Sequence, residues 1–141
     1  MNRESLRCLA EERIKEAQFL VNNGYHSGGY YLAGYAIEIA LKACILKLIE
    51  EEGVIFKRDQ KGFQQDCWSH DLNKLMGKTG LKNEFERDLE NPDELSVNWK
   101  TVINWSEDAR YEFHSKETAQ ELLRAINDET HGVLTWIRQR W

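Results

Sequence analysis

The run HSGGYYLAGYAIEIALKACILKL, residues 26–48, decides the fold of this 141-residue chain. If the run is a helix, one side of it carries only small residues, namely Gly29, Ala33, Ala36, Ala40 and Ala43. Small side chains allow a neighbouring backbone to approach closely, so we expect this seam to pack tightly against another helix. The pattern predicts a long helix that begins near Ser27, its N-cap, and ends at Gly53.

Two further amphipathic patterns flank this run. Apolar residues at three- and four-residue spacing predict a helix over residues 5–23, which Gly24 ends in the left-handed conformation. The same spacing predicts one long final helix that runs nearly to the C-terminus. It begins either at Thr118, in a capping box with Glu121, or one turn earlier at Ser115.

The middle of the chain is less regular. Residues 54–69 are mixed in character and are predicted to form a loop, and Asp71 is expected to cap a short helix. A second short helix is predicted over 81–89, followed by a turn at 91–92 and a short helical or extended piece over 97–105. No alternating run is long enough for a sheet, so the sequence predicts an all-α protein.

Composition indicates one globular domain over residues 1–141. Hydrophobic residues make up 41% of the chain and charged residues 30%, with a single proline and no linker-like stretch. A net charge of −5 argues against a protein that coats long stretches of nucleic acid, because such binding needs many phosphate contacts. It leaves room for a local basic pocket.

Several features lead us to expect a cytoplasmic protein without a membrane anchor. The charged N-terminal stretch has no signal-peptide pattern. The most apolar stretch, residues 30–49, contains Glu38, Lys42 and Lys47, which is not the pattern of a membrane span. The three cysteines, Cys8, Cys44 and Cys67, are widely spaced and form no CxxC pair, as expected of reduced thiols.

The familiar motifs of cofactor and metal chemistry are absent from the sequence. It has no phosphate-binding glycine loop, no dinucleotide fingerprint, no HExxH and no GxSxG. Cys67 and His70 have a metal-like spacing, but structural zinc needs four ligands and no second pair follows. We therefore predict no cofactor and no metal.

Glu38 and Lys42 lie one turn apart on the apolar second helix. One interpretation is an ordinary ion pair on the rim of the fold. The other is a polar spot inside the fold that orients a charged partner. Tyr31 and Tyr35 lie on nearly the same face and are expected to stack.

The segment from Arg110 to His114 also has two interpretations. If it is helical, Arg110 and His114 share a face. An arginine can clamp a phosphate and a histidine can move protons near neutral pH, so the pair could cleave RNA without a metal. The simpler interpretation is an ion-pairing arginine beside a surface histidine.

Four segments taken together resemble the HEPN domain family (higher eukaryotes and prokaryotes nucleotide-binding). They are the run at 26–48, HDLNKL at 70–75, WSEDARY at 105–111, and a final helix that ends in TWI at 135–137. The resemblance covers nearly the whole chain, and the run at 26–48 is its most specific part. It implies an up-and-down antiparallel bundle of four to five helices that forms a homodimer with a groove between the copies.

Many members of that family are metal-independent endoribonucleases of toxin–antitoxin, defence or RNA-processing systems. In those members an arginine is followed after four to six residues by a histidine. Arg110 matches the arginine, but only three residues separate it from His114 here. One residue fewer on a helix rotates a side chain by about 100°, so binding without cleavage is a competing hypothesis.

The resemblance thus implies two functions. In the first, a homodimer binds a nucleotide or RNA phosphate and can act as a metal-independent endoribonuclease, with Arg110 and His114 as catalytic residues. Its binding residues are then Arg110, Tyr111, Glu38, Lys42 and Tyr35. In the second, the chain is a non-catalytic subunit that docks a small nucleotidyltransferase or another protein.

Overall fold

The computed structural model describes residues 1–53, 62–90 and 93–141. These residues form eight α-helices and one 3-10 helix and contain no strand, which confirms the all-α prediction. The number of helices exceeds the four to five expected. Their bounds are α1 Arg3–Asn22, α2 His26–Glu52, α3 Phe63–Cys67, α4 Leu72–Lys78, α5 Lys82–Glu90, α6 Asp93–Ile103, η3 Glu107–Tyr111, α7 Lys116–Asn127 and α8 Val133–Arg138.

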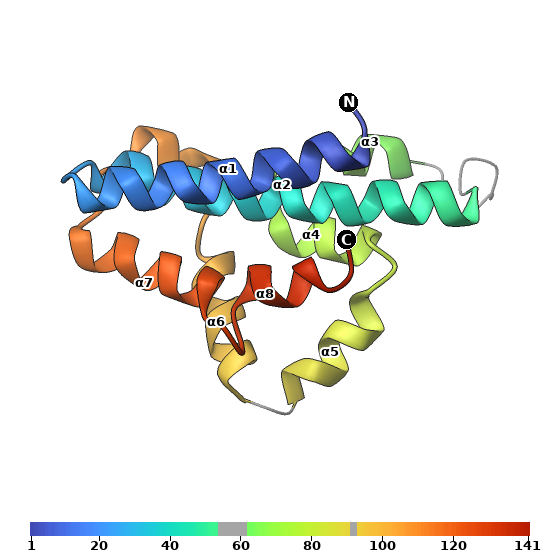
Figure 1. Ribbon diagram of the computed structural model, residues 1–141. Helices are drawn as coiled ribbons and strands as arrows, with labels where there is room; N and C mark the ends of the chain where they lie inside the picture. The colour runs from blue at the N-terminus through green and yellow to red at the C-terminus, as the bar shows by residue number, and fades with distance from the viewer. Residues whose placement is uncertain (54–61, 91–92) are drawn as a thin grey trace.

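The two longest helices, α1 and α2, lie side by side along the molecule (Figure 1). Gly24 joins them in the left-handed conformation, with φ of 86°, as predicted. The seam of small residues on α2 is fully buried, also as predicted. A Cβ at Gly29 would collide with Val21 and would lie 2.9 Å from the carbonyl oxygen of Ala17, so only glycine allows this approach.

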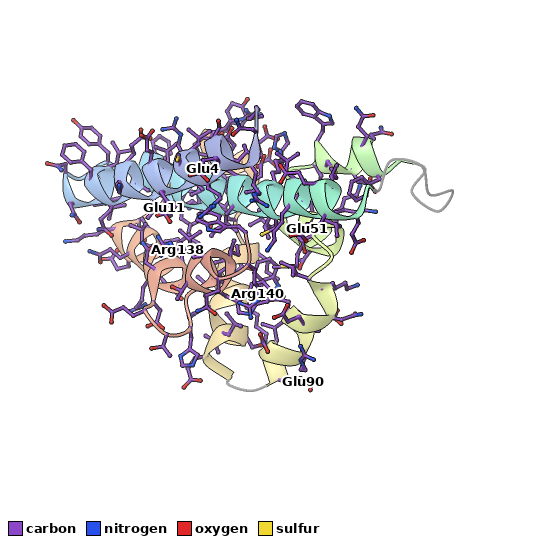
Figure 2. The ribbon with its side chains drawn as sticks, turned by 45° about the vertical axis from the view of Figure 1, so that its right-hand side comes forward. Glu4, Glu11, Glu51, Glu90, Arg138 and Arg140 are labelled. Carbon is purple, nitrogen blue, oxygen red and sulfur yellow. The ribbon has the colours of Figure 1, made fainter. Side chains whose placement is uncertain are left out.

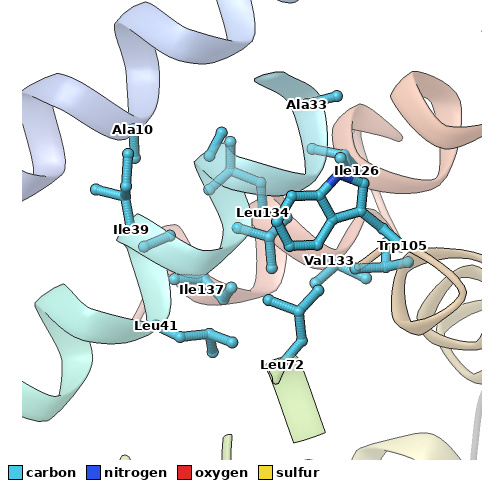
Figure 3. Close-up of a cluster of buried hydrophobic side chains, with 14 of the residues drawn as sticks. Ala10, Ala33, Ile39, Leu41, Leu72, Trp105, Ile126, Val133, Leu134 and Ile137 are labelled. Atoms are coloured by element: carbon cyan, nitrogen blue, oxygen red, sulfur yellow. The ribbon is translucent and has the colours of Figure 1, made fainter. Parts of the chain in front are cut away.

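Four of the remaining elements, α4, η3, α7 and α8, pack against α2. Helices α7 and α8 run below the long pair, α4 lies against the second half of α2, and α5 and α6 extend away from it (Figure 1). Buried apolar side chains of these elements form one continuous cluster. Figure 3 shows Ala10, Leu41, Leu72, Ile126 and Ile137 meeting there from five different helices.

A cluster of aromatic side chains joins α5, α6 and α8. Phe85 of α5 meets the rings of Trp99 and Trp136 edge to face, at centroid distances of 5.0 and 4.8 Å. The guanidinium of Arg140 lies 3.8 Å from the centre of the Trp136 ring. The indole nitrogen of Trp136 donates to Asp88 at 2.8 Å. These contacts fix α5 and α6 against the C-terminal segment.

The prediction of a single long final helix is wrong. The chain breaks after Asn127 and resumes as α8 at Val133. The Asp128 carboxylate accepts from the backbone N–H groups of Thr130 and His131, at 3.2 and 2.6 Å, and this local turn competes with the helical pattern. A Cβ at Gly132 would lie 2.5 Å from two backbone carbonyl oxygens, so the turn also requires glycine.

One helix start differs from the prediction, because the second helix starts at His26 and Ser27 lies inside it without capping it. Of the two starts predicted for the last helix, Ser115 is the one observed as the cap of α7, and its hydroxyl accepts from the backbone N–H of Thr118 at 3.1 Å. Asp71 caps α4 as predicted, because its carboxylate accepts from the backbone N–H of Lys74 at 2.9 Å.

Two predicted connections fall largely beyond the described residues. The loop expected over 54–69 has residues 54–61 outside them, and its described part contains the short helix α3. The turn expected at 91–92 also lies outside them. Among the described helices, none combines the length and the apolar character that crossing a membrane requires.

Candidate functional site

A chain of five ionisable side chains crosses one flank of α2. The Lys42 amine lies 2.8 Å from the Glu38 carboxylate, one helical turn away. Both oxygens of Glu38 contact Nδ1 of His70, at 3.0 and 3.1 Å. Nε2 of His70 lies 3.2 Å from Glu107, whose other oxygen lies 2.8 Å from the Arg110 guanidinium. We call these residues the polar chain.

Three separate elements deliver the members of the polar chain. Glu38 and Lys42 share the same flank of α2 because they are four residues apart. His70 comes just before the cap of α4, where Leu72 anchors that helix in the core. Glu107 and Arg110 belong to η3, which packs against α2.

Gly34 explains why η3 can lie so close to α2. The indole of Trp105, directly before η3, is buried against the backbone at this glycine. Any Cβ there would occupy the space of the ring. Gly34 therefore allows η3, which carries Glu107 and Arg110, to lie close to α2.

Burial changes sharply along the polar chain. The Glu38 side chain is 2% exposed, whereas those of His70 and Arg110 are 45% and 43% exposed. A buried carboxylate is costly unless its charge is compensated, and here Lys42 and His70 both serve that purpose. The polar chain therefore runs from the buried Glu38 carboxylate to the Arg110 guanidinium, which is in contact with solvent.

The contacts of Glu38 fix the proton of the His70 ring. An ionised carboxylate can only accept hydrogen bonds, so Nδ1 of His70 must carry a proton and donate it. The nitrogen at which the ring gains or loses its proton is then Nε2, which points to Glu107. Excluding His70, the polar chain contains two cations and two carboxylates, so its charges balance when the ring is neutral.

Aromatic rings surround the exposed end of the polar chain. Tyr31 stacks on Tyr35 at 5.9 Å, as predicted, and on Trp105 at 6.1 Å. Burial raises the pKa of Tyr31, and the nearby Arg110 opposes that shift. The Arg110 guanidinium lies 5.0 Å from the centre of the Tyr111 ring.

Two aromatic side chains of the segment that follows Arg110 are left uncovered. Tyr111 is 75% exposed and Phe113 is 99% exposed. The surface at Arg110 therefore offers a cation against the Tyr111 ring, with a second exposed ring two residues further along the chain.

His114 lies in different surroundings. It follows η3 in extended backbone, so it does not share a helical face with Arg110. Its ring stacks on Tyr30 at 3.8 Å and is 14% exposed. Its backbone N–H donates to the Ser27 hydroxyl at 2.8 Å, and its Nε2 lies 3.3 Å from Glu112 without forming a hydrogen bond.

The structure thus brings together some of the residues singled out from the sequence. Glu38, Lys42 and Arg110 join in the polar chain, with Tyr35 and Tyr111 close by, whereas His114 is not part of it. Sequence reasoning missed His70 and Glu107 as site residues. Both stand in segments already noted, HDLNKL and WSEDARY, but nothing in their spacing shows that they meet.

The described residues offer two other features of interest. An apolar cleft of about 690 Å³ lies near the second half of α2, lined among others by Leu46, Phe63 and Trp68, and Lys42 reaches its edge. A smaller pocket of about 330 Å³ opens beside His70 and Glu107. In the described part of the chain, no group of three or more His, Cys, Asp and Glu side chains is arranged to hold a metal ion.

Comparisons of the chain with protein-family models, with curated proteins and with solved structures gave no match.

Proposed function

We propose that this chain is a HEPN-like bundle domain that forms a homodimer and binds an RNA or nucleotide phosphate at Arg110. One observation carries the proposal. Three of the segments that resemble the family each contribute to the polar chain: the run at 26–48 gives Glu38 and Lys42, HDLNKL gives His70, and WSEDARY gives Glu107 and Arg110. Segments far apart in the sequence thus converge on one group of charges.

The chemistry of Arg110 suits a phosphate. A guanidinium has five N–H donors in a fork that matches phosphate oxygens. Nη2 of Arg110 lies 2.8 Å from Glu107. Both side chains of this ion pair are partly exposed, at 43% and 28%, and such pairs contribute only about 0–1 kcal/mol. A phosphate can therefore compete with Glu107 for the guanidinium.

The exposed rings favour a single-stranded nucleic acid over a free phosphate. Tyr111, whose ring lies against the Arg110 guanidinium, and Phe113, three residues further along the chain than Arg110, have most of their surface uncovered. Nucleobases stack on such rings, and each stacked base contributes roughly 1–3 kcal/mol. Because every base has a flat face, this mode of binding tolerates many sequences.

The proposed dimer uses a stripe of α2 that the chain itself leaves partly open. Tyr31, Leu32, Tyr35 and Leu46 are only half-buried, and Gly28 is exposed. This stripe lies beside the polar chain, so a second copy packed on it brings two Arg110 side chains to one groove. Its apolar character fits a protein surface rather than solvent.

Metal-independent cleavage of RNA is the catalytic form of this proposal. The observation that favours it is an imidazole nitrogen, Nε2 of His70, one carboxylate away from Arg110. A phosphate clamp next to a group that moves protons near neutral pH is what transesterification of RNA requires.

The alternative is a non-catalytic subunit that docks a small nucleotidyltransferase or another protein. The nearly complete exposure of Phe113 favours it, because an aromatic anchor of this kind is typical of protein interfaces. Under this alternative, the Tyr111 and Phe113 rings bind the partner and the polar chain is structural.

Fluorescence anisotropy with a labelled single-stranded RNA, in EDTA, tests the proposal. We expect Arg110→Ala to weaken binding about tenfold or more, because charge-assisted hydrogen bonds contribute roughly 1.5–3 kcal/mol. Arg138→Ala is the matched control, since Arg138 is 37% exposed and pairs with Glu11 (Figure 2).

Sedimentation velocity on the same samples measures the oligomeric state. A dimer whose RNA affinity falls in Arg110→Ala but not in Arg138→Ala supports the proposal. Equal RNA binding by wild type and Arg110→Ala contradicts it, as does a monomer that binds no RNA. A monomer that captures a nucleotidyltransferase through Phe113 favours the alternative.

A further inference from the structure

Two histidines lie against α2, and they differ in what their rings can do. The His114 ring is pressed flat on Tyr30, 14% exposed, and its backbone is tied to Ser27. The His70 ring is 45% exposed, and both of its nitrogens face carboxylates. Only His70 is connected to Arg110, through Glu107.

The setting of His70 controls its proton in a way that a surface histidine lacks. Glu38 is buried and compensated by Lys42, so it holds Nδ1 in its protonated form and fixes the orientation of the ring. Nε2 is then the nitrogen that exchanges its proton, and it faces the side of Glu107 and Arg110. A buried carboxylate that orients an imidazole in this way is a recurrent device for general acid–base work.

We infer that His70, positioned by Glu38, is the proton-transfer residue of the Arg110 site, and that His114 is not. The inference rests on the proposed function, because it assumes that Arg110 holds an RNA phosphate. His70 is the catalytic residue of this assignment, and Glu38 is a positioning residue that acts through it.

The chemical step balances with these groups. The ribose 2′-hydroxyl gives its proton to Nε2 of His70 as its oxygen bonds to phosphorus. The bond from phosphorus to the 5′ oxygen breaks, that oxygen takes a proton from water, and the hydroxide formed takes the proton back from His70. The products are a 2′,3′-cyclic phosphate and a free 5′-hydroxyl.

Glu107 changes partner during this step. Without RNA it contacts both Arg110 and His70. Once a phosphate takes the guanidinium, the 2′-hydroxyl displaces the Glu107 oxygen from Nε2, and the negative charge of Glu107, still close to the ring, stabilises the imidazolium that forms. The polar chain then gains one positive charge on His70 against one negative charge from the phosphate, so the local balance is kept.

This charge balance predicts that RNA affinity depends on pH. A protonated His70 adds a cation near the bound phosphate, so affinity rises as pH falls through the titration of the ring, and by linkage bound RNA favours protonation. The charged groups around the ring are Glu38 and Lys42 from α2, Glu107, Asp108 and Arg110 from η3, and Asp71 at the start of α4.

The experiment measures RNA cleavage and RNA binding in EDTA across a pH series, with helicity checked for every variant. We expect His70→Gln to reduce cleavage roughly 100-fold or more, the usual contribution of a general acid or base, while binding at alkaline pH changes less than threefold or so. Glu38→Gln should lower cleavage and move the pH profile. His131→Gln, a partly exposed histidine in the turn before α8, is the control.

A second readout does not depend on the variants. In wild-type protein, NMR titration of the imidazole signals should show the midpoint of His70 move to higher pH when RNA is added, with that of His131 unchanged. This shift separates a proton-transfer role from a merely structural one.

The outcomes are distinguishable. Cleavage retained in His70→Gln but lost in Arg110→Ala overturns the inference and leaves the proposed function intact, as does cleavage lost only in His114→Gln. Wild-type protein that binds RNA at Arg110 but does not cleave it at any pH also overturns the inference. Wild-type protein that neither binds nor cleaves RNA refutes the proposed function itself.

Discussion

On the side of α2 that faces α1, the buried contacts come from small and apolar residues, and the neighbour comes from the adjoining stretch of chain. Gly29 lies against the backbone at Ala17, and the small residues that follow it are fully buried. On the flank that faces η3 and α4, buried Glu38 contacts His70, which is 32 positions away, and His70 in turn contacts Glu107. One helix therefore carries a closed structural side and a polar side that opens to solvent at Arg110.

This difference separates a face of α2 that stabilises the fold from a flank that carries the candidate site. The apolar side needs only close packing, which small residues provide at little cost in side-chain entropy. The polar flank carries Glu38, whose burial costs free energy unless its partners stay in place. Changes on the apolar side should therefore alter stability, whereas changes on the polar flank should mainly alter binding.

The largest expected contrast concerns thiol reactivity. Cys44 lies on the closed part of α2, and burial raises the pKa of its thiol from an ordinary value of 9.0 to about 12. Because only the thiolate reacts, this shift lowers the reactive fraction about 1000-fold. Alkylation at mildly alkaline pH, followed by mass spectrometry, should label the exposed Cys8 rapidly and leave Cys44 unmodified. Equal labelling would mean that the packing around Cys44 opens readily.

The next test compares two adjacent glycines. Gly29→Ala should destabilise the protein by about 1–3 kcal/mol, because its Cβ would collide with Val21 and the backbone at Ala17. Gly28→Ala should stabilise it by about 0.5 kcal/mol, because that Cβ would meet only Leu20 at 3.7 Å and alanine favours helix. Urea unfolding followed by circular dichroism measures both. Equal effects at the two positions would rule out a tight seam.

A third test addresses the buried carboxylate. Glu38→Ala should cost about 1–2 kcal/mol of stability, since Lys42 and His70 lose their shared partner but can turn to water. RNA cleavage should fall more than this modest cost suggests, because the His70 ring loses its fixed orientation. Urea unfolding and a cleavage assay on the same preparation give both numbers. A variant with normal RNA cleavage would assign Glu38 to structure alone.

The smallest effect belongs to an ion pair remote from either flank. The Arg138 hydrogen bond holds the pKa of Glu11 below its ordinary value of 4.5. A lowered pKa gives stability that is present above 4.5 and lost as pH falls below it. Both side chains are about one third exposed, so the contribution is less than about 1 kcal/mol. Wild type should therefore lose slightly more stability than Glu11→Gln between neutral pH and pH near 3, in parallel urea titrations.

The close α1–α2 pair could be predicted from the sequence because its signal is local. A seam of small residues, the stops at Gly24 and Gly53, and the Tyr31–Tyr35 spacing all follow from helical periodicity. The break at Asp128 was missed because the apolar pattern on either side continues in phase, although Asn127, Asp128 and Gly132 are residues typical of turns.

The polar chain was only half predictable. The contact of Glu38 with Lys42 could be predicted from helical spacing, and the family resemblance singled out Arg110 as a candidate site residue. His70 and Glu107 could not, because their roles depend on which distant segments η3 and α4 bring to α2. Periodicity describes one element at a time, whereas a site of this kind is made by tertiary packing.

The most direct test is an NMR titration that follows the arginine side-chain N–H signals while a short single-stranded RNA is added in EDTA. We predict that the Arg110 signals shift and saturate with the RNA, while those of Arg138, held by Glu11 (Figure 2), stay in place. RNA that shifts other arginines but leaves Arg110 unchanged, or that shifts none, would contradict a phosphate site at this arginine.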